Sequence, residues 1–285
     1  MKQLFIFIII LISNVSFSQN EANIWYFGGK AGLDFNSGAP VALTDGQMVT
    51  QEGCASIADT NGNLQFYTDG STIWTKNHSI MINGTGLNGH FSSSQSAIIV
   101  PKPETPDIYY AFTVDFQGEP NGLQYSEVDM SLNTGLGAVT TNKNILLLTP
   151  VLEKLTAVQH ANGNDIWVIA HNNGSAEFYA FLVTNTGIQT PVITDIGFSY
   201  SGSSYDNNAG YMKASPDGTK LAMAFPKFSN GLQLFDFNNA TGQITNFRNF
   251  NDVPGAVQPY GLEFSPSGDL LYVSGSGGIG QFDVT

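Results

Sequence analysis

Two histidines, His160 and His171, flank a run of alternating apolar residues that predicts a β-hairpin, so their rings could face each other across two strands. Such a pair could bind a metal ion or respond to pH, because imidazole is a common metal ligand and titrates near neutrality. The sequence has no His-x-x-x-His pattern and no cysteine cluster to supply a third ligand. We therefore favour a hydrogen-bonding role for His160 within its own repeat.

The aromatic residues are the second group that could contact a ligand. Three tryptophans and eleven tyrosines could stack on sugar rings. At strand positions such rings more often pack neighbouring sheets together, which is the interpretation we favour. We keep Trp74 and Trp167, together with the two histidines, as candidate residues of a ligand surface.

Motifs for catalysis are scarce. The segment around Asp69 and Trp74 partly matches the sialidase Asp-box, but a sialidase needs three arginines for the substrate carboxylate and this chain has only Arg248. No nucleophile elbow, phosphate-binding loop or dinucleotide fingerprint occurs. We therefore predict no catalytic, cofactor-binding or metal residues and no enzyme. The alternative is a glycan hydrolase or lyase, which would need a carboxylate pair or a metal at a central channel.

Clusters of Asp and Asn raise the question of calcium. One cluster has the Asp-x-Asn-x-Asn spacing that begins a calcium loop, but no glutamate closes it at the twelfth position. We interpret these side chains as turn residues that bond their own backbone, and a weak structural calcium site remains the alternative. The clusters contain Asp59, Asn61 and Asn63, then Asn162, Asn164 and Asp165, and finally Asp217.

Charge excludes two classes of partner. The chain has 10 basic and 23 acidic residues, so its net charge is −13. An acidic protein repels phosphate groups, so we expect neither nucleic acid nor anionic membrane as a partner. Cys54 is the only cysteine, which rules out an internal disulfide, and its small-residue surroundings predict a buried apolar role.

The first 18 residues predict export. Lys2 precedes an unbroken apolar run over 4–12, and small residues lie three and one positions before Gln19. This is the pattern of a signal peptide, and the run is too short to span a bilayer. We predict a signal peptide over 1–18 and a mature chain over 19–285 that is secreted or held at the cell surface without membrane insertion.

The mature chain predicts an all-β fold, because short runs of β-branched and aromatic residues alternate with turns rich in Gly, Asn and Asp. One turn pattern recurs about every fifty residues, and each copy is followed by further strands. The copies are 59–67, 161–169, 215–223 and 265–273, with 106–114 as a copy that lacks the glycine. A β-sandwich gives no reason for this period, whereas the four-stranded blades of a β-propeller do.

We count about six blades, the first and last of them partial, in a ring of six or seven when whole. The last unit stops within a β pattern, and we expect the chain to be a fragment. Five residues of the predicted second strands should hold comparable half-buried positions: Phe66, Tyr110, Trp167, Met223 and Tyr272.

The segment from Asn23 to Val114 carries a resemblance. Its motifs include Asn23–Gly28, Gly32–Phe35, Phe66–Gly70 and Gln95–Pro101. They resemble the propeller-bearing, gliding motility-associated surface proteins of Bacteroidota that are exported by type IX secretion. The resemblance implies a surface or secreted propeller with a C-terminal sorting domain, which this sequence lacks. We therefore expect a binding or structural scaffold for adhesion, surface assembly or polysaccharide capture, with an extracellular glycan or surface protein as partner.

Overall fold

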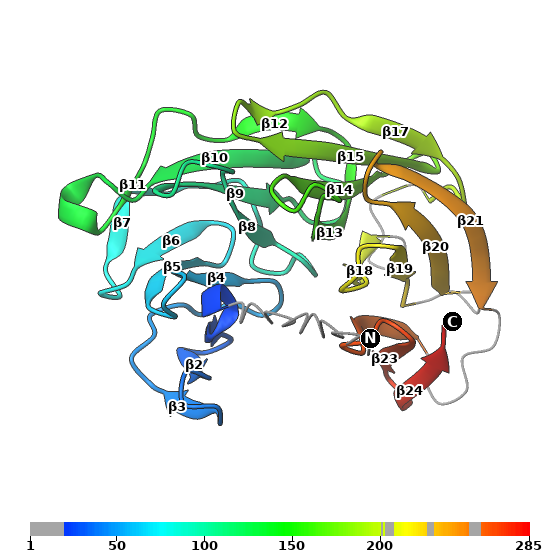
Figure 1. Cartoon of the computed structure of the whole chain (residues 1–285), viewed down its shortest axis with the longest axis horizontal. Helices are drawn as coiled ribbons and strands as arrows, with labels where there is room; N and C mark the ends of the chain where they lie inside the picture. Colours follow the sequence, from blue (N-terminus) through cyan, green and yellow to red (C-terminus); the bar gives the residue numbers. More distant parts are fainter. Residues whose placement is uncertain (1–19, 201, 203–207, 227–230, 251–257) are drawn as a thin grey trace, which may run out of the picture.

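The computed structural model describes residues 20–200, 202, 208–226, 231–250 and 258–285. Its strands form successive sheets that follow one another around an axis, in the order of the sequence (Figure 1). This radial repetition confirms the predicted all-β propeller. No helix among the described residues is long and apolar enough to cross a membrane, and residues 1–18, where we predict the signal peptide, lie outside the described residues.

Among the described residues six blades can be distinguished, and each has its first strand innermost (Figure 1). The first blade contains β1 (Ile24–Phe27), β2 (Ala31–Asp34) and β3 (Val41–Leu43). The second contains β4 (Ala55–Ala58), β5 (Leu64–Thr68), β6 (Thr72–Thr75) and β7 (Ile80–Thr85). The third contains β8 (Ala97–Pro101), β9 (Ile108–Val114), β10 (Leu123–Asp129), β11 (Ala138–Val139) and β12 (Ile145–Leu148).

The other three blades follow the same plan. The fourth contains β13 (Val151–Gln159), β14 (Ile166–Asn172), β15 (Glu177–Thr184), β16 (Gly187–Ile188) and β17 (Val192–Asp195). The fifth contains β18 (Met212–Ala214), β19 (Lys220–Ala224), β20 (Leu232–Asn238) and β21 (Gln243–Phe250). The sixth contains β22 (Pro259–Phe264), β23 (Leu270–Gly275) and β24 (Gly278–Asp283).

The recurring turn joins the first strand of a blade to the second, as its sequence predicts. In each copy the glycine has a positive φ, between 69° and 83°, which residues with a Cβ rarely adopt. Its N–H donates to the carbonyl oxygen three residues earlier, at 2.8–2.9 Å. The four glycines that share this geometry are Gly62, Gly163, Gly218 and Gly268.

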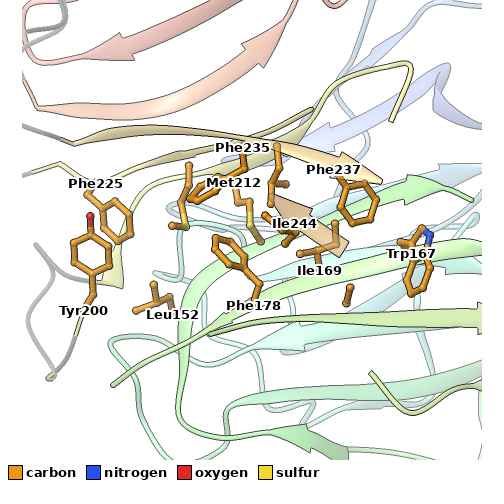
Figure 2. Packing of buried hydrophobic residues seen from close by; sticks show 13 residues of the cluster. Leu152, Trp167, Ile169, Phe178, Tyr200, Met212, Phe225, Phe235, Phe237 and Ile244 are labelled. Carbon is orange, nitrogen blue, oxygen red and sulfur yellow. The ribbon is translucent and has the colours of Figure 1, made fainter. Parts of the chain in front are cut away.

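The core lies between neighbouring blades. Figure 2 shows the cluster between the fourth and fifth blades, where Phe178 meets Phe235 edge to face with ring centroids 5.0 Å apart. Met212 and Ile169 fill the space beside them (Figure 2). Burying a side chain of this size stabilises a fold by about 1.5–3 kcal/mol, so each interface adds substantially to the stability of both blades.

The second-strand residues are more buried than we predicted, with one exception. Phe66, Tyr110, Trp167 and Met223 lie on second strands and are 0–4% exposed. Tyr272, on β23, is 37% exposed because it lines a depression beside the sixth blade. The expectation of comparable half-buried positions is therefore wrong.

The second and third blades are also joined at their outer edges. β7 pairs with β11 in parallel, through Ala138 and Ile82. The Asn83 side-chain amide donates to the carbonyl oxygens of Val139 and Thr140, both at 3.1 Å. This link explains why the strands of two blades form one continuous sheet.

Candidate functional site

Polar side chains gather where the innermost strands begin. Glu52 precedes β4, Ser94 precedes β8, Glu153 belongs to β13 and Tyr260 belongs to β22. These four residues come from segments far apart in the sequence, and hydrogen bonds join them around the axis. We call them the Glu52 cluster.

Irregular strand pairing sets the direction of the Glu153 and Tyr260 side chains. The register of β13 on β14 shifts between Val151 and Leu155, so Glu153 lies in an unpaired stretch. The register of β22 on β23 shifts between Pro259 and Gly261, which places Tyr260 in a similar irregularity. Such bulges bend a strand and redirect side chains, and they are common beside active sites.

Tyr260 connects two members of the cluster. Its hydroxyl group lies 2.9 Å from Glu52 Oε1 and 3.0 Å from Ser94 Oγ. The Ser94 hydroxyl donates to Glu153 Oε2 at 3.0 Å and accepts the backbone N–H of Gly210. Two carboxylates are therefore linked through a tyrosine and a serine.

Glu153 is held as an acceptor. Its side chain is 1% exposed, and the backbone N–H groups of Ser94 and Gln117 donate to its two oxygens, each at 2.9 Å. Both carboxyl oxygens of Glu153 are therefore held in place by backbone donors.

Glu52 has a different environment. Burial is the largest cause of a raised pKa at Glu52, and the charge of Glu153 raises it further. The hydroxyl groups of Tyr260 and Ser92 oppose the shift because they hydrogen-bond the ionised form. A buried carboxyl group with a raised pKa beside a second carboxyl group is an arrangement that acid–base catalysis uses.

Lys154, next to Glu153, places a cation below the cluster. Its ammonium group is fully buried, donates to the carbonyl oxygens of Asn208 (2.8 Å) and Ala209, and lies 4.1 Å from the ring centroid of Phe225. Burial lowers the pKa of Lys154, and the charge of Glu153 opposes this. Because the ammonium group is fully buried and bonded to two backbone carbonyls, it holds the backbone in place and cannot contact a substrate.

Gln95 fixes the spacing of three blades beneath the site. Its Oε1 accepts the N–H groups of Leu155 (3.1 Å) and Met212 (2.7 Å), and its Nε2 donates to the Met212 carbonyl oxygen at 3.1 Å. Gln95 itself precedes β8, so one side chain joins the third, fourth and fifth blades.

A depression of about 380 Å³ adjoins the cluster, within the size range of small-molecule sites. Tyr260 belongs to the Glu52 cluster and also lines the depression. Its ring lies beside that of Tyr211, with ring centroids 5.8 Å apart. Burial raises the pKa of Tyr211, with smaller contributions from Cys54 and Glu52. Its remaining lining residues are Gly261, Leu262, Glu263, Tyr272, Ser274 and Ile279.

The two histidines of the sequence prediction are not brought together. His160 lies in the turn before β14 and His171 near the end of that strand. His160 Nδ1 accepts the N–H of Asn162, and its Nε2 lies 3.2 Å from the carbonyl oxygen of Ala240. It therefore ties the turn to the fifth blade. His171 is fully buried against Phe178, with ring centroids 4.5 Å apart.

The two tryptophans pack against hydrophobic clusters of the propeller. Trp74 stacks on Tyr67, with ring centroids 5.5 Å apart and planes 12° apart. Trp167 is 4% exposed and its Nε1 donates to the carbonyl oxygen of Asn239 at 2.8 Å. Neither residue belongs to the Glu52 cluster.

The Asp and Asn clusters form turns. Asp59 Oδ1 accepts the N–H groups of Asn61 and Asn63, each at 2.9 Å. Asn162 Oδ1 accepts those of Asn164 and Asp165 at 3.0 Å. Among the residues that the structure describes, no group of three or more His, Cys, Asp or Glu side chains could hold a metal ion. Whether calcium binds stays a prediction.

Cys54 is half-buried, and burial raises the pKa of its thiol to about 11, so it is a poor nucleophile.

Sequence reasoning missed the Glu52 cluster because its members share no motif. Their one common signal is position, since each lies just before or just within the first strand of a predicted blade.

Comparisons with known proteins support the fold. Neither a scan against family models nor a search of curated proteins finds a match. The periplasmic gluconolactonase PpgL of Pseudomonas aeruginosa is similar in structure, with a TM-score of 0.58, 14% identity, and coverage of 89% of this chain and 72% of that one. A Bacteroides fragilis protein, provisionally assigned as a 6-phosphogluconolactonase, gives a TM-score of 0.51 and 14% identity, and covers 91% and 75%.

These similar structures change the functional interpretation. Both are named for hydrolytic enzymes, and neither is described as a scaffold. The expectation of a non-enzymatic binding or structural scaffold is therefore wrong, and these names fit its alternative, a propeller-type glycan hydrolase or lyase, better.

Proposed function

We propose that this chain is a hydrolase that opens sugar lactones. The observation that carries the proposal is the Glu52 cluster, in which burial raises the pKa of Glu52 and the Tyr260 and Ser94 hydroxyl groups link it to the buried Glu153. The similar structures named for lactonases indicate the substrate class.

The cluster suits the chemistry of ester hydrolysis. Ionised Glu52 takes a proton from a water molecule as the water oxygen bonds to the lactone carbonyl carbon. The carbonyl electrons move onto oxygen, where a hydroxyl donor stabilises the anion. The ring C–O bond then breaks, and the proton on Glu52 passes to the ring oxygen. One water is consumed, and the product is a hydroxy acid.

The Tyr260 hydroxyl is suited to stabilise that anion, because Tyr260 lines the depression and belongs to the cluster. It donates to Glu52 before the reaction, and it can turn to the developing anion once Glu52 has taken the proton.

The charges at the site favour an unphosphorylated lactone. Lys154 is fully enclosed and bonded to backbone carbonyls, and Lys213 is paired at 2.9 Å with Glu263, which lines the depression. A phosphate ester would also meet the negative charge of Glu52 and Glu153, and among the described residues no arginine or lysine lines the depression to pair it. The negative charge of these two glutamates also favours departure of the anionic product.

We further propose that the enzyme acts outside the cytoplasm, after removal of residues 1–18. The signal-like sequence supports this, as does the periplasmic location named for the Pseudomonas aeruginosa protein. The resemblance to gliding motility-associated surface proteins supports a location at the cell surface.

The test is hydrolysis of D-glucono-1,5-lactone, followed by titration of the acid released and corrected for the spontaneous rate. We expect the purified chain to accelerate hydrolysis, and Glu52→Gln to reduce kcat about 100-fold or more. Glu127→Gln, on β10, is the matched control and should retain activity. A rate equal to the spontaneous one, or equal loss in both variants, would contradict the proposal.

A further inference from the structure

A second cavity lies at the opposite end of the innermost strands. It has a volume of about 800 Å³ and forms where β4, β8 and β13 end, whereas the Glu52 cluster lies where they begin. Among the described residues, no member of the Glu52 cluster lines this cavity. The short helix η1 (Asn20–Ala22) contributes Glu21 and Ala22 to its wall.

Tyr109 is an enclosed polar side chain in this cavity. It is 8% exposed and lines the cavity, and in the described part of the chain its hydroxyl group makes no hydrogen bond. Contact with Phe66 fixes its ring edge to face, with centroids 5.5 Å apart. The Tyr109 hydroxyl is therefore able to bond to a ligand that enters the cavity.

The charge around this hydroxyl is negative. Glu21 and Asp59 line the cavity, and no Lys, Arg or His does so among the described residues. Burial raises the pKa of Tyr109, and the charges of Asp59, Asp107 and Glu21 raise it further. Lys76 favours the ionised form of Asp59 but does not line the cavity.

The remaining wall combines aliphatic side chains with uncharged polar ones. Ile57, Ile99 and Val158 contribute aliphatic surface between the polar groups. Asp59 is occupied by the N–H groups of its own turn, so few carboxylate oxygens remain for coordination. An anionic cavity that also offers aliphatic surface fits an organic cation with an apolar body.

We propose that this cavity binds a small organic ammonium, a primary amine carried on an apolar body. The ammonium group lies between the Glu21 carboxylate and the Tyr109 hydroxyl and donates to both, and the apolar body packs on Ile57, Ile99 and Val158. This site is separate from the proposed lactonase site and does not depend on it.

The test is calorimetric titration of the purified chain with benzylammonium chloride, and with benzyl alcohol and benzoate as neutral and anionic counterparts of similar shape. We expect benzylammonium to bind at least about tenfold more tightly than either, because only the cation interacts favourably with the carboxylates. Equal binding of all three, or no binding of benzylammonium, would overturn the proposal.

Variants locate the site. Tyr109→Phe and Glu21→Gln should each weaken benzylammonium binding about fivefold or more, because each removes one hydrogen-bonding group. Tyr125→Phe, on β10 and outside the cavity, should leave binding unchanged. Glu52→Gln should also bind normally, which separates this site from the lactonase proposal. Unchanged binding in both cavity variants would place the amine elsewhere and refute the assignment.

Discussion

Tyr260 and Glu52 lie 208 residues apart in the sequence, yet the Tyr260 hydroxyl is 2.9 Å from Glu52 Oε1. The contact joins the sixth blade to the segment that precedes the second. It also places a hydrogen-bond donor on a carboxylate whose pKa burial raises. The acidity of Glu52 therefore depends on blades from both ends of the chain.

Two substitutions should shift the pH dependence of lactone hydrolysis in opposite directions. The Tyr260 hydroxyl lowers the pKa of Glu52, so Tyr260→Phe should move the acidic limb of kcat/KM to higher pH. The charge of Glu153 raises that pKa, so Glu153→Gln should move the limb to lower pH. Each shift should be on the order of one pH unit, measured with D-glucono-1,5-lactone.

Both variants need circular dichroism to confirm that they fold, because Glu153 is buried and accepts backbone hydrogen bonds. Shifts of the same sign, or an acidic limb that neither substitution moves, would show that Glu52 is not the titrating base.

Acid should destabilise the protein through His171. Burial, together with the charge of Lys154, lowers the pKa of His171 to about 4 from an ordinary value of 6.5, although a contact with the Asn172 carbonyl opposes this. The unfolded chain therefore binds the proton more readily, and stability present above pH 6.5 is lost as the pH falls toward 4. The loss should reach about 3 kcal/mol, measured by urea unfolding between pH 7 and 4.

The matched variant is His171→Phe, which keeps an aromatic ring against Phe178 and removes the titrating group. Its free energy of unfolding should fall less between pH 6.5 and 4 than that of the natural sequence. A parallel decline in both proteins would assign the acid sensitivity to other groups.

Gln95 should matter more for stability than its single amide suggests. Gln95→Leu keeps a side chain of similar volume but leaves the N–H groups of Leu155 and Met212 and the Met212 carbonyl oxygen without their partner. We expect a loss of about 3 kcal/mol or more in the free energy of unfolding. Gln189→Leu, at an exposed position, should change it by less than about 0.5 kcal/mol.

The fold was largely predictable because its main signals are local. The turn that carries Gly62, Gly163, Gly218 or Gly268 needs a positive φ and recurs with the blades, so one pattern indicated both the hairpins and their period. The extra pairing between β7 and β11 was not predictable. It depends on how two outer edges meet in space, which neither strand encodes alone.

The site was not predictable from the same signals. His160 and His171 are neighbours in a predicted hairpin, but they lie toward opposite ends of β14 in the structure. Glu52, Ser94 and Tyr260 come from three separate repeats and meet only because the innermost strands converge on one axis. Residue types and spacing describe a repeat, whereas the approach of distant repeats depends on ring geometry and on the irregular starts of β13 and β22.

The contact between the fourth and fifth blades should depend on Gly242. This residue has φ of +76°, and a Cβ placed on it would lie 2.6 Å from the ring of Trp167. Gly242→Ala should therefore combine backbone strain with a clash against a buried ring. Gly38 has a similar φ of +81°, and no atom lies within 4 Å of the position that a Cβ would take there, so Gly38→Ala isolates the backbone contribution. We expect Gly38→Ala to cost about 1 kcal/mol of unfolding free energy and Gly242→Ala about 1–3 kcal/mol more. Trp167 fluorescence should shift only in the Gly242 variant, and equal costs in the two variants would mean that the ring moves aside freely and does not pack tightly between these blades.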